Sequence, residues 1–325
     1  MGKNTKIAWA THTHNPWIGC TKVSPGCANC YAEVDGATVK SDVKWGVGQP
    51  RLRTTPANWN KPLAWNTSAK AAGERHRVFC ASLSDWLDDE VPVEWLADLL
   101  LLIQSTPDLD WLLLSKRPEN WQKRLEAVRD HGGMTGLAVT WLAGCAPKNV
   151  WVGTTVEDQR RAHERLPHLI RIPAVIRFIS MEPLLEEVNL FPFLPCEEST
   201  PRNCSKGLQN CSACPAYNCG DNTTPRLIDW VIIGGESGDH ARSFQLNWVR
   251  RLLHQCRFNG IPCFIKQLGA RPTQSDEEVS LSIGQFPVDV GPRGRLQRPI
   301  VLNHRKGGDM AEWPEDLRVQ EFPCQ

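Results

Sequence analysis

Three cysteines near the N-terminus, Cys20, Cys27 and Cys30, follow the spacing C-x6-C-x2-C within one short segment. Three thiolates can hold three irons of a four-iron cluster and leave the fourth iron open to a small-molecule cofactor. A structural zinc site normally takes four protein ligands, and His12 or His14 could supply the fourth, so zinc remains an alternative. The segment predicts a metal-binding loop, with redox chemistry as the leading interpretation.

A second group of cysteines lies further along the chain, at Cys196, Cys204, Cys211, Cys214 and Cys219. The surrounding residues are polar and contain proline, so this stretch cannot build a core of its own and needs a metal or cross-link to become ordered. Four of these thiols could bind zinc or hold a second, auxiliary iron-sulfur cluster. The sequence does not choose between the two metals.

Composition limits the classes of protein that this chain can be. It has 325 residues, 41% of them hydrophobic, and a formal net charge of +1, so no overall field draws it to nucleic acid or to an acidic membrane. No long apolar run and no signal-peptide pattern is visible, and we expect a cytoplasmic protein without a membrane partner. In that reducing compartment, 13 cysteines favour metal ligands and free thiols over a disulfide framework.

Short apolar runs alternate with amphipathic segments after residue 76. The predicted strands are 77–82, 110–114, 149–154, 174–179, 229–233 and 262–266, and the predicted helices are 93–104, 118–130, 158–170 and 246–259. This alternation favours a parallel sheet, open or closed into a barrel. Residues 31–76 are expected to form a less regular connection, in which Trp45, Trp59 and Trp65 serve as packing anchors or stack on a planar ligand.

Polar residues follow each predicted strand. In a (β/α) barrel the carboxyl ends of the strands share the face that carries the active site. From these positions we expect a cofactor site formed by Ser82, Asp85, Arg117, Thr154, Ser180, Gly234, Gly235, Glu236 and Ser237. The same positions supply candidates for anion binding, substrate binding or proton transfer, namely Lys116, Glu157, Glu182 and Lys266.

Several short motifs occur together with the first three cysteines. They are Asn15-Pro16-Trp17, Ser84-Asp85, Ser115-Lys116-Arg117-Pro118, Val150-Trp151-Val152-Gly153, Ser180-Met181-Glu182-Pro183-Leu184-Leu185, Gly234-Gly235-Glu236-Ser237-Gly238 and Phe264-Ile265-Lys266-Gln267. As a set, over residues 7–270, they resemble a phage- and mobile-element-associated family of uncharacterised proteins related to radical S-adenosylmethionine (radical SAM) enzymes. The first cysteine gap is three residues longer than in the usual C-x3-C-x2-C loop of those enzymes.

The resemblance implies an α/β fold: a partial (β/α) barrel of about six parallel strands over residues 1–270, with a Cys-rich insertion at 191–226 and a C-terminal extension at 271–325. It implies a [4Fe-4S] cluster whose open iron binds SAM, and cleavage of SAM to methionine and a 5′-deoxyadenosyl radical. An electron donor such as flavodoxin or ferredoxin would be the partner. The sequence does not identify the substrate, and a nucleobase or nucleotide is one candidate class.

Two other functions are compatible with the same residues. One is a zinc-stabilised module that binds nucleic acid or protein without catalysis, and the other is a cluster protein that does not cleave SAM. Release of 5′-deoxyadenosine by the reduced protein separates both from the radical SAM hypothesis.

Overall fold

The computed structural model describes residues 5, 7–132, 136–194, 227–275 and 297–324. The chain divides into two compact units: unit 1 comprises residues 1–155 and 164–178, and unit 2 comprises residues 156–163 and 179–325. Among the described residues, no helix has the length and apolar character needed to cross a membrane.

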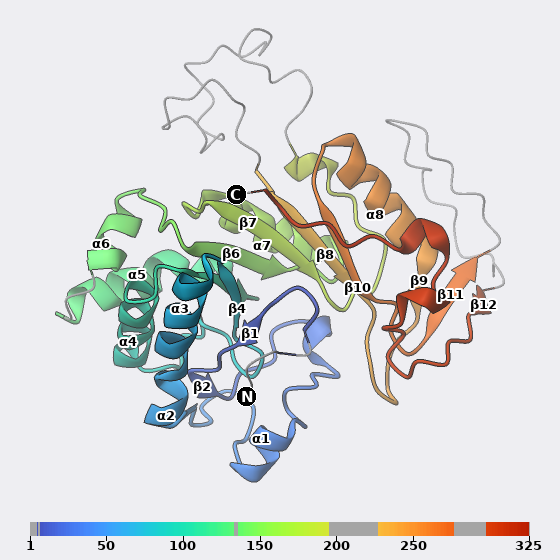
Figure 1. Cartoon of the computed structure of the whole chain (residues 1–325). Coiled ribbons are helices and arrows are strands. Elements are labelled where there is room, and N and C mark those ends of the chain that lie inside the picture. The colour runs from blue at the N-terminus through green and yellow to red at the C-terminus, as the bar shows by residue number, and fades with distance from the viewer. Residues whose placement is uncertain (1–4, 6, 133–135, 195–226, 276–296, 325) are drawn as a thin grey trace, which may run out of the picture. The chain divides into compact units, whose positions relative to one another are not determined.

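Unit 1 is built on short, buried, parallel strands (Figure 1). They are β1 (His12–Thr13), β4 (His76–Cys80), β5 (Leu109–Ser115) and β6 (Val150–Thr155), followed by the first half of β7 (Ile176–Met181). β1 pairs with β4, β4 with β5 and β5 with β6, each in parallel. Every residue of β6 is buried, as expected for a strand inside a parallel sheet.

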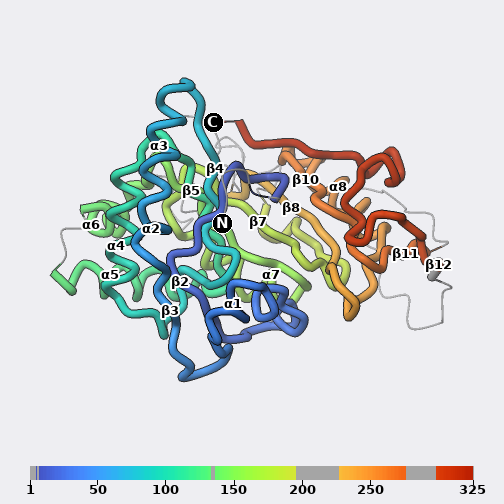
Figure 2. Tube along the Cα trace, turned by 60° about the horizontal axis from the view of Figure 1, so that its bottom comes forward, coloured from blue at the N-terminus to red at the C-terminus, as the bar shows by residue number. Residues whose placement is uncertain are grey.

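Helices of unit 1 cover one side of these strands in both Figure 1 and Figure 2. They include α3 (Lys61–Ala72), α4 (Val93–Gln104) and α5 (Trp121–Asp130), while α6 (Gly136–Leu142) lies beside α5. In α4 the buried residues Leu96, Leu99, Leu100 and Ile103 recur at helical spacing and form the face turned to the core.

The connection at residues 31–76 is more regular than its sequence predicted. It contains α1 (Gly36–Lys40), β3 (Leu52–Arg53), α2 (Pro56–Trp59) and α3, and β3 pairs with β2 (Trp17–Ile18) in antiparallel fashion. Two prolines of this connection, Pro56 and Pro62, stand in the first turns of α2 and α3. Proline is favoured there because its missing N–H has no partner in the first turn of a helix.

The tryptophans of this connection are packing residues. Trp59 and Trp65 are buried. The guanidinium of Arg53 lies 4.4 Å above the Trp59 ring. The interpretation of these residues as packing anchors is therefore confirmed for Trp59 and Trp65, which contact other side chains of unit 1.

Unit 2 contains the second half of β7 with β8 (Trp230–Gly234) and β10 (Cys263–Gln267), and β8 and β10 pair in parallel. The helix α8 (Leu246–Phe258) supplies buried residues such as Val249, Leu252 and Leu253. A smaller sheet has the order β12 (Gln297–Pro299), β11 (Pro272–Ser275), β9 (Phe244–Gln245). Close to the C-terminus, Gln320 forms an antiparallel bridge with Phe264 of β10.

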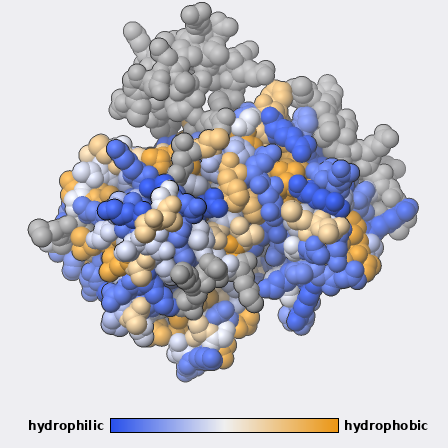
Figure 3. All heavy atoms as spheres, viewed as in Figure 1, coloured by the Kyte–Doolittle hydropathy of each residue, from blue (hydrophilic) through white to orange (hydrophobic). Residues whose placement is uncertain are grey.

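The mixed α/β class and the parallel strands expected from the sequence are confirmed. Among the described residues the main sheet has the strand order β1-β4-β5-β6-β7-β8-β10, and all six predicted strands are present in it. The seventh, β1, is only two residues long and leaves no apolar run to detect. The helix α7 (Gln159–Arg171) corresponds to the predicted helix at 158–170. On the face shown in Figure 3, hydrophilic and hydrophobic residues are interspersed.

Candidate functional site

The three N-terminal cysteines lie on one loop of unit 1, residues 20–30, which we call the cysteine loop. It follows β2, and the backbone N–H of Gly19 donates to the Leu83 carbonyl at 3.1 Å, which fixes the start of the loop to the segment after β4. Gly19 has φ 111°, and a Cβ there would lie 3.1 Å from side-chain carbons of Val43 and Arg51. A glycine is therefore required where the chain turns into the loop.

The thiols of the loop are free and differ in environment. Cys27 is buried within a short 3-10 turn, Pro25–Cys27. Cys20 and Cys30 are partly exposed, and Cys30 packs against a small apolar cluster that includes Ile18 and Leu83.

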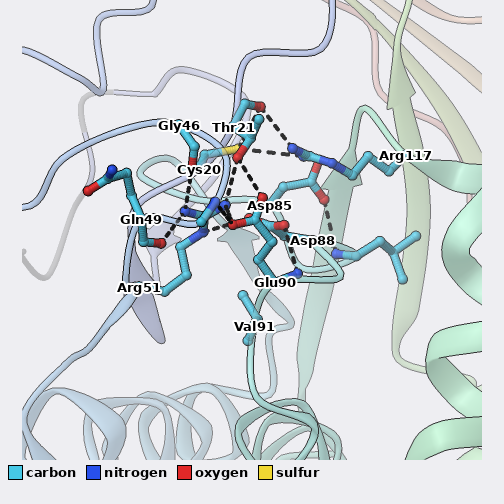
Figure 4. Close-up of polar contacts among 12 residues, drawn as sticks. Cys20, Thr21, Gly46, Gln49, Arg51, Asp85, Asp88, Glu90, Val91 and Arg117 are labelled. Atoms are coloured by element: carbon cyan, nitrogen blue, oxygen red, sulfur yellow. Dashed lines mark hydrogen bonds and ion pairs between the residues drawn. The ribbon is translucent and has the colours of Figure 1, made fainter.

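Arg117 joins the cysteine loop to the carboxyl end of β5. Its Nη1 atom lies 3.5 Å from Cys20 Sγ and 3.0 Å from Asp85 Oδ2, and its Nη2 atom donates to the Thr21 carbonyl at 2.8 Å. Asp85 also accepts from the backbone N–H groups of Lys116 and Leu87, at 2.9 and 3.0 Å. Figure 4 shows the guanidinium between the Cys20 sulfur and the Asp85 carboxylate.

Arg51 holds the same loop from the other side. Its buried guanidinium pairs with Asp88 at 2.9 Å and with Glu90 at 3.4 Å, and it donates to Thr21 Oγ1 at 2.8 Å. It also donates to the Gly46 and Gln49 carbonyls. Thr21 is therefore held twice, through its carbonyl by Arg117 and through its hydroxyl by Arg51 (Figure 4).

The electrostatic surroundings separate Cys20 from Cys27. Burial, reinforced by the Asp85 carboxylate, raises the pKa of the Cys20 thiol to about 12, although Arg117 acts in the opposite direction. Burial also acts to raise the pKa of Cys27, but the Lys116 ammonium and hydrogen bonds at Val23 and Ser24 outweigh it and lower that pKa below its ordinary value. Lys116 and Arg117, adjacent in sequence, thus act on different cysteines.

The donor set of this loop fits a thiophilic metal or cluster, because thiolates are the ligands that iron-sulfur clusters take. Beside the loop, the Ser84 hydroxyl oxygen is buried and has no hydrogen-bond partner among the described residues, so a bound group could satisfy it. Within the part of the chain that the structure describes, no three His, Cys, Asp or Glu side chains are already arranged around a metal position.

Two other predicted residues of unit 1 take part in local hydrogen bonds. Thr154 Oγ1 donates to the Ser115 carbonyl at 2.8 Å, between β6 and β5. Ser82 is held by Asn15, whose Oδ1 accepts from the backbone N–H groups of Ser82 and Leu83 at 2.7 and 2.9 Å. Asn15 and Arg51 shape the site but were not among the predicted site residues; only the Asn15-Pro16-Trp17 motif pointed to the first.

Unit 2 brings together a separate set of predicted residues at the carboxyl ends of β7, β8 and β10. Lys266 Nζ lies 2.8 Å from Glu182 Oε1, and Ser180 Oγ lies 3.5 Å from Glu182 Oε2. A Cβ at Gly234 would approach Glu182 Oε1 to 2.8 Å, so the absence of a side chain at Gly234 makes room for this carboxylate.

Glu236 forms a further ion pair of unit 2, with Arg242. Its Oε1 atom lies 2.5 Å from Arg242 Nη2, and its Oε2 atom accepts from Arg242 Nε at 3.0 Å. Hydrogen bonding to Glu236 raises the pKa of Arg242, and the charge of the buried Glu157 contributes to the same shift. Arg242 was not among the predicted site residues, because it belongs to no recognisable motif.

Two more predicted residues, Gly235 and Ser237, follow β8 in the same unit. The Gly235 backbone packs against Leu268 and Gly269, where an added Cβ would come within 2.6 Å of the Leu268 carbonyl oxygen. Ser237 is partly buried in the irregular segment that follows β8. Cys196, Cys204, Cys211, Cys214 and Cys219 lie outside the described residues.

Comparison with known proteins gives a family but no activity. A family model described as "Protein of unknown function (DUF5131)" matches residues 4–305, which is most of the chain. No curated protein and no solved structure matches it.

Proposed function

This chain belongs to the family described as Protein of unknown function (DUF5131), and we propose that it is a radical SAM enzyme that uses a [4Fe-4S] cluster bound by Cys20, Cys27 and Cys30. The fold type proposed with it is the partial (β/α) barrel of those enzymes. When bound and reduced, the cluster supplies the electron that cleaves SAM to methionine and a 5′-deoxyadenosyl radical, which removes hydrogen from a substrate.

One observation carries the proposal: three free thiols share a single loop, and two of them, Cys20 and Cys27, are each acted on by a cation from the carboxyl end of β5. Lys116 lowers the pKa of Cys27, and Arg117 donates to Cys20 Sγ at 3.5 Å. Metal ligation requires thiolates, and a nearby cation favours the thiolate. The pKa of Cys27 is lowered in this way, whereas burial and Asp85 outweigh Arg117 at Cys20 and keep its pKa raised. A metal site rarely exists fully formed before the metal binds. Binding of the cluster would therefore bring the three sulfur atoms together.

Residues of the chain would perform the remaining tasks. In unit 1, the groups that we propose for contact with the carboxylate of SAM are the Lys116 ammonium and the Ser84 hydroxyl, which has no hydrogen-bond partner among the described residues. In unit 2, we propose that the Glu182–Lys266 pair holds and moves a proton on the substrate, because a carboxylate 2.8 Å from an ammonium can exchange one with little movement. Glu236, fixed by Arg242, is proposed to accept from a hydroxyl or ammonium group of a bound molecule.

The test begins with anaerobic reconstitution with iron and sulfide, followed by iron and sulfide analysis and visible spectroscopy. We expect the wild-type chain to bind an iron-sulfur cluster and Cys27→Ala to lose cluster absorbance. Cys145→Ala, which changes an exposed cysteine of the same unit, is the matched control and should keep it. Equal cluster content in Cys27→Ala and the wild type would reject the ligand assignment.

Catalysis is tested by reducing the reconstituted protein with dithionite in the presence of SAM and measuring 5′-deoxyadenosine by chromatography. We expect release from the wild type and none from Cys27→Ala. A cluster without 5′-deoxyadenosine would support a cluster protein that does not cleave SAM. Bound zinc without a cluster would support the non-catalytic binding module.

Nucleobases and nucleotides are the substrate class that we propose to test first, with flavodoxin or ferredoxin as the electron donor. Deuterium transfer from a labelled substrate into 5′-deoxyadenosine would identify the hydrogen that is abstracted. Absence of transfer from every nucleobase and nucleotide tried would remove that class and leave the SAM-cleaving activity as a separate result.

A further inference from the structure

We propose that Arg117 is a positioning residue that fixes Cys20 as a cluster ligand and raises the reduction potential of the cluster through its N–H···S contact. This inference rests on the proposed function, since it assigns a role toward the cluster proposed there. It gives Arg117 a task different from the cofactor contact expected from the sequence.

The geometry of Arg117 supports a positioning role. One buried guanidinium contacts the sulfur of Cys20, the carbonyl of the next residue, Thr21, and the carboxylate of Asp85. The planar fork of arginine can make such contacts in fixed directions, which the single ammonium of lysine cannot. Cys20 is therefore held at the end of β5 by a residue that lies 97 positions away in sequence.

Asp85 in turn fixes the direction of the fork. Its carboxylate is buried and accepts from two backbone N–H groups as well as from Arg117, so it cannot rotate without losing these bonds. Because Asp85 and Arg117 form a pair at 3.0 Å, their charges partly cancel, and the directed N–H remains as the local influence on the sulfur.

A hydrogen bond to a ligand sulfur stabilises the more negative, reduced state of an iron-sulfur cluster. Such outer contacts also orient the ligand, and their loss weakens metal binding. Removing the Arg117 donor should therefore make the cluster harder to reduce and the loop a poorer ligand. A residue that served the fold alone would change stability without changing the potential.

The experiment compares the midpoint potentials of the cluster, without SAM, in the wild-type chain of 325 residues, in Arg117→Gln and in the double variant Asp85→Asn/Arg117→Gln. Arg117→Gln alone leaves the Asp85 carboxylate without its cation. The double variant removes both charges, so any change in potential that it keeps comes from loss of the hydrogen bond to Cys20. In both variants we expect the ratio of reduced to oxidised cluster at a fixed potential to fall about tenfold, which for one electron is about 59 mV. Arg129→Gln, at an exposed arginine of α5, is the control and should match the wild type.

An unchanged potential in folded, cluster-loaded Arg117→Gln and Asp85→Asn/Arg117→Gln would overturn the inference. If these variants do not fold, Arg117→Lys carries the test, because it keeps the charge and loses the fork; a wild-type potential in that variant would overturn the inference as well. Circular dichroism shows which variants are folded, iron content shows which carry the cluster, and only variants that meet both conditions are compared.

A failure of the proposed function gives a different result. If the wild type binds no iron-sulfur cluster, the proposed function fails, and Arg117 is then tested by titrating the metal-free protein with Co²⁺ and following the thiolate-to-cobalt absorption. We expect Arg117→Gln to bind Co²⁺ about tenfold more weakly than the wild type, in line with the loss of an outer-shell partner. Equal Co²⁺ affinities would overturn the positioning role.

Discussion

Cys20 and Cys27 belong to one loop but stand in opposite electrostatic environments. The pKa of Cys20 is raised to about 12 by burial and by Asp85, whereas Lys116 and local hydrogen bonds lower the pKa of Cys27 despite its burial. The thiolate is the form that binds metal. Cys27 is therefore the thiol that we expect to bind the first metal ion.

This difference can be measured in the metal-free protein by the pH dependence of alkylation with iodoacetamide, followed by mass spectrometry. The pH midpoint for Cys27 should lie below the ordinary value of 9.0, and the midpoint for Cys20 should lie above it. Midpoints are compared because limited access slows alkylation without moving the midpoint. Lys116→Met should raise the Cys27 midpoint, and Lys123→Met, at an exposed lysine, should not; identical midpoints for the two cysteines would contradict this account.

His14 is a second residue with an unusual titration. Its ring is buried among Trp59, Trp65 and Trp111, and neither ring nitrogen has a hydrogen-bond partner among the described residues. Burial, with a smaller contribution from Lys61, lowers its pKa from 6.5 to about 3. The folded protein therefore keeps His14 neutral in a range where the unfolded chain protonates it.

The sign of the resulting pH effect follows from linkage. Between pH 6.5 and about 3 the unfolded state binds the extra proton, so this residue lowers the free energy of unfolding as the pH falls through that window. The slope from one such group is at most about 1.4 kcal/mol per pH unit. Urea unfolding of His14→Leu should show a shallower decline in stability than the wild type below pH 6.5; parallel declines would show that other groups cause it.

At the scale of elements, the contact between β6 and β7 within unit 1 depends on Gly153, which has no side chain. A Cβ at Gly153 would come within 2.4 Å of the Phe178 ring. Gly153→Ala should therefore destabilise the protein by about 1–3 kcal/mol, the usual cost of overpacking. Urea unfolding of Gly153→Ala, Phe178→Leu and the double variant measures the coupling, and the double variant should lose less stability than the sum of the singles. Strict additivity would contradict the contact.

The strands and the cysteine loop could be predicted from the sequence because their signals are local. Apolar runs identified β4 to β8 and β10 except for their ends, and the spacing of Cys20, Cys27 and Cys30 marked the loop. Arg51, Asn15 and Arg242 were missed as site residues. Arg51 acts on Asp88, which lies 37 positions away, and Asn15 acts on Ser82, which lies 67 positions away.

The helices α2 and α3, which the sequence did not predict, have a related explanation. The prolines and tryptophans of residues 50–65 are typical of irregular chain, and the hydrophobic pattern of α3 is weak because only Pro62, Trp65 and Ala69 are buried in it. Packing of Trp65 against His12 and His14 supplies what the local pattern lacks. Tertiary contacts therefore decide the structure here, and a single sequence does not display them.

At the scale of the whole molecule, the chain passes between the two units more than once. Residues 156–163 belong to unit 2, but residues 164–178 return to unit 1 and bring Phe178 against Gly153 and Trp9. Unit 1 is therefore not one continuous stretch of sequence.

This interleaving predicts how fragments behave. A fragment of residues 1–155 lacks Phe178 and the returning segment and should show no cooperative urea transition by tryptophan fluorescence. A fragment of residues 1–181 restores that segment and should unfold cooperatively, since it completes unit 1. Equal behaviour of the two fragments would show that the returning segment contributes little to unit 1.

The double attachment of Thr21 has a consequence for variation in this loop. Its carbonyl and hydroxyl are each occupied by a different arginine, so the chain is anchored immediately after Cys20. Residues could be inserted or deleted between Thr21 and Cys27 without displacing the first sulfur, because the added length would be absorbed beyond the anchor. Under the proposed radical SAM function, the C-x6-C gap is then a permitted variation in length, and we expect loops with other spacings to present the same leading thiol in the same place.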